Sequence, residues 1–165
     1  MTTNDKVLFI DDEPTSILLV KSIVSNTLQL TVAHIENAKE AMAYIDKNKR
    51  DLIAVILDLN MPEMDGIQVL KEIREKYSSD ILPVIFLTGA DFTTEDLNVI
   101  FHLGATDVLA KVTAEGIPLT ILINRLKTYI AFHEEKKNNK RSKVKLTKWL
   151  SKELSKSEYQ FHEKT

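Results

Sequence analysis

The sequence predicts an open, doubly wound α/β fold in which five parallel strands alternate with five helices. Two observations carry this prediction: short, near-continuous apolar runs, and between them segments with apolar residues at helical spacing. Such runs are typical of strands buried on both faces of a parallel sheet, and their alternation with helices favours right-handed βαβ units. The expected strands are residues 7–10, 31–35, 52–57, 83–87 and 108–110.

The helices are expected from apolar residues that recur on one face. Pro14 and Pro118 lie near two expected helix starts, where a proline is well tolerated. Residues three, four and seven positions apart share one face of an α-helix. Three such sets follow the second, third and fifth strands: Ala38, Ala41, Met42 and Ile45; Ile67, Leu70 and Ile73; Leu122, Leu126, Tyr129 and Ile130.

The composition fits one domain of ordinary size with an appendage. The chain has 165 residues, of which 44% are hydrophobic, enough for a substantial core. It has no cysteine, which excludes disulfide and thiolate chemistry and suits the cytoplasm. The first apolar run is too short for a secretory signal, and no stretch approaches the ~20 apolar residues of a membrane span. We therefore expect a cytoplasmic protein.

Charge divides the chain into an acidic body and a basic tail. The net charge is only −2. Residues 1–135 carry 12 Lys or Arg against 21 Asp or Glu, a net charge of −9, whereas residues 136–165 carry 10 against 3, a net charge of +7. We expect one domain over residues 1–130 and a basic, helical extension or linker over residues 131–165.

Polar residues stand at four of the five expected strand ends. Asp11 and Asp12 follow the first strand, Asp58 the third, Thr88 the fourth and Lys111 the fifth. Ligands of open parallel sheets bind beyond these carboxyl ends. Taken singly, each residue has an ordinary explanation, such as an acid at a helix start, a turn aspartate or a solvated lysine. Together at one sheet edge they predict a binding site.

The acids at this edge predict a magnesium site. Neighbouring carboxylates raise one another's pKa, and a hard divalent cation relieves their repulsion. Mg²⁺ prefers oxygen ligands and keeps several waters. We expect Asp12 and Asp58 to be direct ligands, Asp11 to act mostly through water, and the backbone carbonyl of Asn60 to reach the ion from the following loop.

With the metal in place, Asp58 is a plausible nucleophile, because a carboxylate can form an aspartyl phosphate. Catalysis of phosphoryl transfer is mostly positioning and electrostatic stabilisation. We expect Mg²⁺ to hold one phosphoryl oxygen, Lys111 a second, and the Thr88 hydroxyl with nearby backbone N–H groups a third.

Four segments resemble the receiver domain of two-component response regulators: FIDDEP (9–14), LDLNMPEMDG (57–66), LTGA (87–90) and LAK (109–111). The resemblance covers about residues 5–130. It implies a flavodoxin-like fold with strand order 2-1-3-4-5. It also implies that Asp58 accepts a phosphoryl group from a sensor histidine kinase or a histidine phosphotransfer protein, with Mg²⁺ at Asp11 and Asp12, Thr88 as the switch hydroxyl and Lys111 on the phosphoryl group.

By the same resemblance the chain is not an ordinary enzyme but catalyses its own phosphorylation and dephosphorylation. Two positions depart from the family pattern. Val112 replaces a proline that usually follows the lysine in cis; a cis bond before valine costs ~2.5–4 kcal/mol, so either Lys111 is placed differently or site contacts maintain the bond. Val108 stands where the family tends to have an aromatic ring, so we expect switching by helix or loop shifts. Asn60 is expected to face attacking water.

Three alternatives stay open. The chain could be the receiver and linker of a longer regulator whose effector domain is absent. It could be a receiver that no longer takes phosphate, given Val108 and Val112. A phosphohydrolase of the haloacid dehalogenase type also uses an aspartate nucleophile, but it carries a second aspartate where this chain has Asn60.

The basic tail predicts a second helix after a break at Asn138 and Asn139. Seven of residues 136–148 are Lys or Arg. A solvated linker is the favoured interpretation, while contact with nucleic acid or a membrane surface stays open, as does a homodimer through the fifth helix and the tail. The four histidines lack ligand spacing, and we expect all of them to be structural or exposed: His34, His102, His133 and His162. One apolar stripe is expected on the second helix: Leu146, Trp149, Leu150 and Leu154.

Overall fold

The computed structural model describes the chain at residues 5–62, 64–89, 93–111 and 119–162, and its side chains up to residue 145 apart from Met64 and Leu119. The chain divides into two units, Met1–Tyr129 and Ile130–Thr165. The first unit contains the whole central sheet. The Lys111–Val112 peptide bond, on which the sequence left two interpretations, lies outside the described residues.

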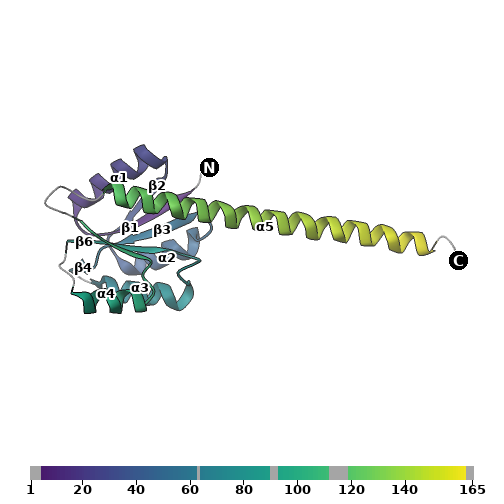
Figure 1. The fold of residues 1–165 in the computed structure, drawn as a ribbon. Helices are drawn as coiled ribbons and strands as arrows, with labels where there is room; N and C mark the ends of the chain where they lie inside the picture. The colour runs from purple at the N-terminus through teal and green to yellow at the C-terminus, as the bar shows by residue number, and fades with distance from the viewer. Residues whose placement is uncertain (1–4, 63, 90–92, 112–118, 163–165) are drawn as a thin grey trace. The chain divides into compact units, whose positions relative to one another are not determined.

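Five parallel strands form the sheet of the first unit (Figure 1). Along the sheet they follow the order β2-β1-β3-β6-β7, and each neighbouring pair is parallel. Counted along the chain, this is the order 2-1-3-4-5, so the predicted fold class is confirmed. The strands are β1 (Lys6–Ile10), β2 (Thr31–Ile35), β3 (Leu52–Leu57), β6 (Val84–Thr88) and β7 (Asp107–Ala110).

Five helices cover the two faces of the sheet. Helix α1 (Pro14–Leu28) and the first turns of α5 (Leu119–His162) lie on one side, and α2 (Ala38–Asn48), α3 (Gly66–Lys76) and α4 (Thr94–His102) on the other (Figure 1). Local chemistry fixes their starts. Pro14 is the first residue of α1, as predicted, and the Asn37 side chain caps α2 by accepting from two backbone N–H groups.

The two helical layers bury the central strands β1, β3 and β6 and leave the edge strands β2 and β7 partly exposed. All six residues of β3 are buried, which explains why its sequence is a continuous apolar run rather than an alternating one. Phe9 and Phe86 are the largest fully buried side chains. The central strands are therefore held by close packing, which fixes the positions of the residues at their ends.

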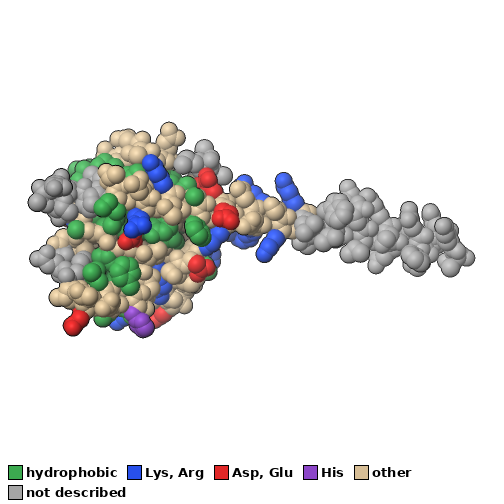
Figure 2. All heavy atoms as spheres, viewed as in Figure 1, with side chains coloured by type: hydrophobic (Ala, Val, Ile, Leu, Met, Phe, Trp, Pro, Cys, Tyr) green, Lys and Arg blue, Asp and Glu red, His purple; other side chains and the backbone are tan. Residues whose placement is uncertain are grey.

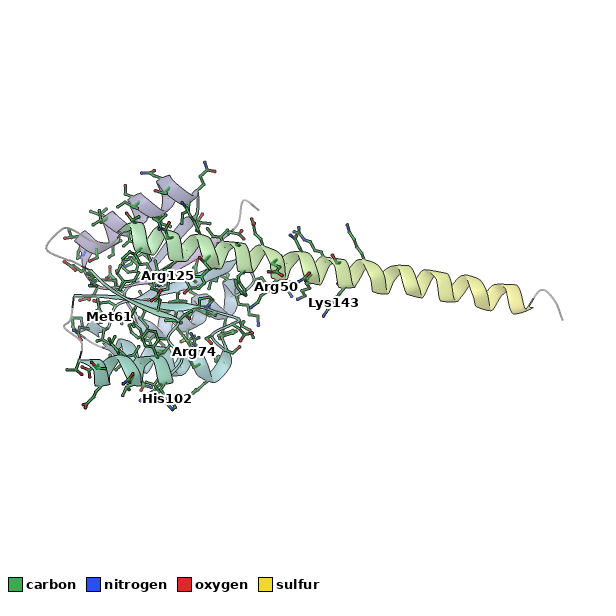
Figure 3. All side chains as sticks on the ribbon, viewed as in Figure 1. Arg50, Met61, Arg74, His102, Arg125 and Lys143 are labelled. Atoms are coloured by element: carbon green, nitrogen blue, oxygen red, sulfur yellow. The ribbon has the colours of Figure 1, made fainter. Side chains whose placement is uncertain are left out.

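Arg74 of α3 joins three segments around the sheet (Figure 3). Its Nε donates to the Gly104 carbonyl at 2.8 Å, and its Nη1 donates to the carbonyls of Tyr77 and Leu82 at 3.1 and 3.0 Å. Burial lowers the pKa of the guanidinium to about 10. One side chain thus satisfies backbone acceptors at the end of α3, before β6 and after α4.

Two short strands were not expected from the sequence. Strands β4 (Asn60–Met61) and β5 (Met64–Asp65) form an antiparallel hairpin directly after β3, with Asn60 opposite Asp65. Two-residue strands are too short to show any periodicity. The hairpin holds the loop that follows Asp58.

The predicted break at Asn138 and Asn139 is wrong, because α5 runs without interruption from Leu119 to His162. Asparagine costs well under ~1 kcal/mol in a helix interior, and this segment has no glycine or proline to end it. The side chains of the expected apolar stripe, at residues 146–154, lie outside those described. None of the helices in the described part of the chain has the length and apolar character that a membrane span requires.

Candidate functional site

The strand ends bring the predicted residues to one edge of the first unit. Strands β1 and β3 end in register with each other, and so do β6 and β7. Asp11, Asp58 and Lys111 are the first residues beyond β1, β3 and β7, and Thr88 is the last residue of β6. Parallel strands that end together point their next side chains into one shared space.

Lys111 is the centre of this site. Its Nζ lies 2.7 Å from Asp11 Oδ2, 2.9 Å from Asp58 Oδ2 and 3.4 Å from Glu13 Oε2. Asp11 is 0% exposed, Asp58 5% and Lys111 7%. The Lys111 N–H donates to the carbonyl of the buried Thr88 at 2.7 Å, which fixes where the lysine side chain begins. Buried charges of this kind are tolerated only when they are paired.

The ammonium group stays charged in this setting. Burial by itself lowers the pKa of Lys111, but the hydrogen bonds to Asp11 and Asp58 and the charges of these two carboxylates together outweigh it and leave the pKa raised. Burial raises the pKa of Asp11, against the opposing effect of Lys111. The hydrogen bond from Ser16 Oγ and the charge of Lys111 lower the pKa of Glu13. The Lys111 ammonium group therefore pairs with three carboxylates, those of Asp11, Glu13 and Asp58.

The donor set fits a magnesium ion. Asp11, Asp12 and Asp58 each offer one carboxylate oxygen, and these oxygens lie within 4.8 Å of one another. Asp58 Oδ1 is buried and has no hydrogen-bond partner among the described residues. Leaving such an oxygen unsatisfied is costly, and a hard cation that seeks oxygen would satisfy it. Asp11 is already engaged, because its Oδ1 accepts from the Glu13 N–H at 2.8 Å.

Close backbone approach shapes the loop after Asp58. The Gly66 N–H donates to the Leu59 carbonyl at 2.9 Å, and a Cβ at position 66 would lie 2.3 Å from the Asp58 carbonyl oxygen. Only glycine lets α3 begin so near Asp58. The Asp65 side chain caps that helix by accepting from the second helical N–H at 2.8 Å. The exposed Asn60, two residues past Asp58, lies in the hairpin.

An open pocket of about 790 Å³ adjoins the site. Its wall is formed by Asp12, by the start of α2 with Asn37, by the β4–β5 hairpin with Met61 and Pro62, and by Glu72 of α3. Asp12 thus borders both the acid cluster and a cavity large enough to admit part of a partner molecule.

The sequence did not indicate a contribution from the second strand, and the structure corrects this. His34 Nε2 lies 2.7 Å from the carbonyl oxygen of Asp11, and its ring lies 6.3 Å from the ring of Phe9. His34 is half-buried and contacts the backbone, which agrees with the expectation that it is structural, but the sequence did not show that its partner is a site residue. The contact depends on the register of β2 against β1, with His34 opposite Phe9, and the expected strand order does not specify that register.

Comparison with known proteins agrees with this geometry. Residues 7–119 match the model of the response regulator receiver domain family. The chain is 31% identical over 137 residues to a probable cyclic di-GMP phosphodiesterase of Vibrio cholerae, covering 83% of this chain and 27% of that protein. It is 35% identical over 108 residues to the regulatory protein VanR of Enterococcus faecium, covering 66% of this chain and 44% of that protein.

A solved structure shows the same fold. The receiver domain of the Francisella response regulator 1452 superimposes with a TM-score of 0.64 at 27% identity, covering 81% of this chain and 99% of that one. The chain spans less than half the length of the two curated relatives. On the family match and the fold, this chain belongs to the response regulator receiver domains of two-component signalling systems.

Proposed function

We propose that this receiver accepts a phosphoryl group on Asp58 in a Mg²⁺-dependent reaction. One observation carries the proposal: a buried carboxylate has one oxygen 2.9 Å from the Lys111 ammonium and a second oxygen without a partner among the described residues. The first arrangement would hold a transferred phosphoryl group, and the second suits a cation. Asp12 and Asp58 would hold the ion, with Asp11 acting through water and the Asn60 carbonyl as a further ligand.

The donor would be a phosphohistidine of a sensor histidine kinase or of a histidine phosphotransfer protein. A carboxylate oxygen of Asp58 attacks phosphorus, the phosphorus–nitrogen bond breaks, and the imidazole nitrogen leaves with the bonding electron pair. Lys111 pairs with one phosphoryl oxygen and the Thr88 hydroxyl donates to another. Mg²⁺, when bound, supplies neutralisation of the carboxylate charge and polarises the phosphoryl group.

The phosphoryl group is lost from Asp58 by hydrolysis. Water attacks phosphorus and the Asp58 carboxylate leaves. The exposed Asn60 is near enough in sequence to influence that water, so the chain would catalyse its own dephosphorylation. A cytoplasmic location remains part of this proposal.

Incubation with acetyl phosphate and Mg²⁺, followed by intact-mass measurement, tests the proposal. We expect the wild-type mass to rise by one phosphoryl group and Asp58→Asn to show no gain. Asp46→Asn is the matched control, because Asp46 is a carboxylate on α2 whose partners are Lys76 and Tyr77 rather than the site. A wild-type chain that gains no mass would instead support a receiver that no longer takes phosphate.

The output would run through the face formed by α4, β7 and α5. Phosphorylation would draw Thr88 and Lys111 toward the phosphoryl group, and the segments attached to them would follow. Exposed apolar side chains on α4 and α5 support this face as a dimer contact: Val99 is 52%, Phe101 46% and Ile121 47% exposed.

Light scattering at several concentrations, with and without the phosphate mimic beryllofluoride, tests the dimer. We expect the mimic to raise the average mass and Phe101→Ser to prevent the rise. Leu18→Ser is the control, because Leu18 is 71% exposed on α1. Monomer masses throughout would remove the dimer from the proposal.

The greater length of the relatives supports an effector domain beyond this chain, with the tail as its linker. Figure 2 shows described Lys and Arg side chains gathered along the second unit, a charge pattern that would also suit nucleic acid or an anionic membrane surface. The complete reading frame decides whether an effector follows. The family match gives no support to the phosphohydrolase alternative.

A further inference from the structure

We propose that His34 is a positioning residue, which holds the turn between β1 and α1 in the conformation that binds Mg²⁺. The inference rests on the proposed function, because it concerns the same metal site. Its basis is the contact of His34 Nε2 with the Asp11 carbonyl oxygen at 2.7 Å. The imidazole touches neither phosphate nor metal in this account, and it acts through the backbone.

The sheet places His34 for this task. His34 and Phe9 are paired across the β2–β1 ladder, so their side chains stand on the same face, and their rings are tilted at 55° with centroids 6.3 Å apart. Phe9 is fully buried in the core. The ladder between these strands ends with Ile10 opposite Ile35. His34 therefore reaches past the last rung of the ladder and adds one further contact between β2 and β1.

The atom that His34 contacts explains why this position matters. The Asp11 carbonyl belongs to the planar peptide unit that joins Asp11 to Asp12. Fixing its direction restricts both residues, and hence the starting points of two of the three carboxylates in the acid cluster. The Asp11 side chain is fixed separately by the Glu13 N–H. Outer contacts of this kind orient metal ligands and are part of a metal site's affinity.

The contact also determines where the imidazole proton lies. A carbonyl oxygen can only accept, so Nε2 must carry a hydrogen and donate it. This is a property of the wild-type protein that can be measured without metal, phosphate or any substitution. Nitrogen-15 NMR of the histidine ring nitrogens should find Nε2 of His34 protonated.

Three variants test the effect on the metal. His34→Phe keeps a ring beside Phe9 but removes the donor, and we expect the Mg²⁺ dissociation constant, measured by calorimetry, to rise about tenfold. His34→Gln places an amide N–H at a similar reach and should restore most of the affinity. His102→Gln is the control, because His102 is an exposed residue in the last turn of α4 (Figure 3), and its affinity should equal that of the wild type.

Thermal unfolding without Mg²⁺ shows which variants are folded. Unchanged Mg²⁺ affinity in a folded His34→Phe, or an unprotonated Nε2 in the wild type, would overturn the inference. If His34→Phe does not fold, the protonation of Nε2 in the wild type and the Mg²⁺ affinity of His34→Gln decide whether the inference holds. If the wild-type chain binds Mg²⁺ and takes phosphate but substitution of His34 leaves the Mg²⁺ affinity unchanged, only this inference is wrong. If the wild-type chain binds no Mg²⁺, the proposed function and this inference are both wrong.

Discussion

Replacing Gly66 by alanine tests how closely the fold packs around Asp58. The added Cβ would lie 2.3 Å from the Asp58 carbonyl oxygen, 2.9 Å from Leu59 Cα and 3.1 Å from Phe86 Cε1. The two nearest atoms are backbone, so no side-chain rotation can relieve the contact. Helix α3 must move away from the end of β3, or the loop that carries Asp58 must shift.

Two effects of opposite sign determine the change in unfolding free energy of Gly66→Ala. Overpacking of a well-packed region costs about 1–3 kcal/mol, and contact with two backbone atoms places this case near the upper end. Alanine is the better helix former by at most about 1 kcal/mol. The steric term therefore wins, and we expect Gly66→Ala to lose about 2 kcal/mol of unfolding free energy. For a domain of this size that lowers Tm by about 7 °C.

Urea unfolding followed by circular dichroism measures this loss. Gly89→Ala is the matched control for stability, because a Cβ at position 89 meets no atom within 4 Å in the described part of the chain. Phosphorylation of Gly66→Ala by acetyl phosphate should also slow by one to two orders of magnitude, since a displacement of about 1 Å can cost about 100-fold. Gly66→Ala with wild-type stability and wild-type rate would refute the reasoning.

Three further substitutions have defined outcomes. Arg74→Met should lose about 3 kcal/mol in urea unfolding, because three backbone carbonyls lose charged donors, and Arg74→Lys should not rescue it. The hydrogen bond to Asp46 raises the pKa of Tyr77 to about 12. The stability that this hydrogen bond contributes is therefore complete below pH ~10 and is lost as the pH rises toward 12. Tyr77→Phe should remove this loss of stability and one late ionisation from the ultraviolet titration, and an unchanged titration would contradict the prediction. Lys111→Met should lose about 3 kcal/mol without Mg²⁺, and Mg²⁺ should stabilise it more than it stabilises the wild type; equal gains would contradict a shared site.

The fold was predictable because its signals are local. Each strand contains a short, near-continuous apolar run, and the five runs expected from the sequence lie within one residue of the observed strands. The break expected at Asn138 and Asn139 failed because a polar pair only weakens a helix, whereas glycine or proline ends it. The β4–β5 hairpin was missed because two-residue strands carry no period.

The site was predictable as far as strand order determines it. Residues that follow the carboxyl ends of parallel strands lie at one edge of the sheet. Asp11, Asp58 and Lys111 could therefore be placed at the same edge from the sequence, although β6 lies between β3 and β7. The contact of His34 with the Asp11 backbone could not, because it depends on the register of β2 against β1. The close approach of Gly66 to Asp58 likewise depends on where α3 packs, which no local pattern specifies.

Chemical localisation of the phosphoryl group tests the central claim most directly. Wild-type protein is incubated with acetyl phosphate in Mg²⁺ or in a chelator, reduced with borohydride, which converts an aspartyl phosphate to homoserine, and then mapped by tandem mass spectrometry. We predict homoserine at position 58, only when Mg²⁺ is present. Homoserine at another aspartate, or equal conversion in the chelator, would contradict the account.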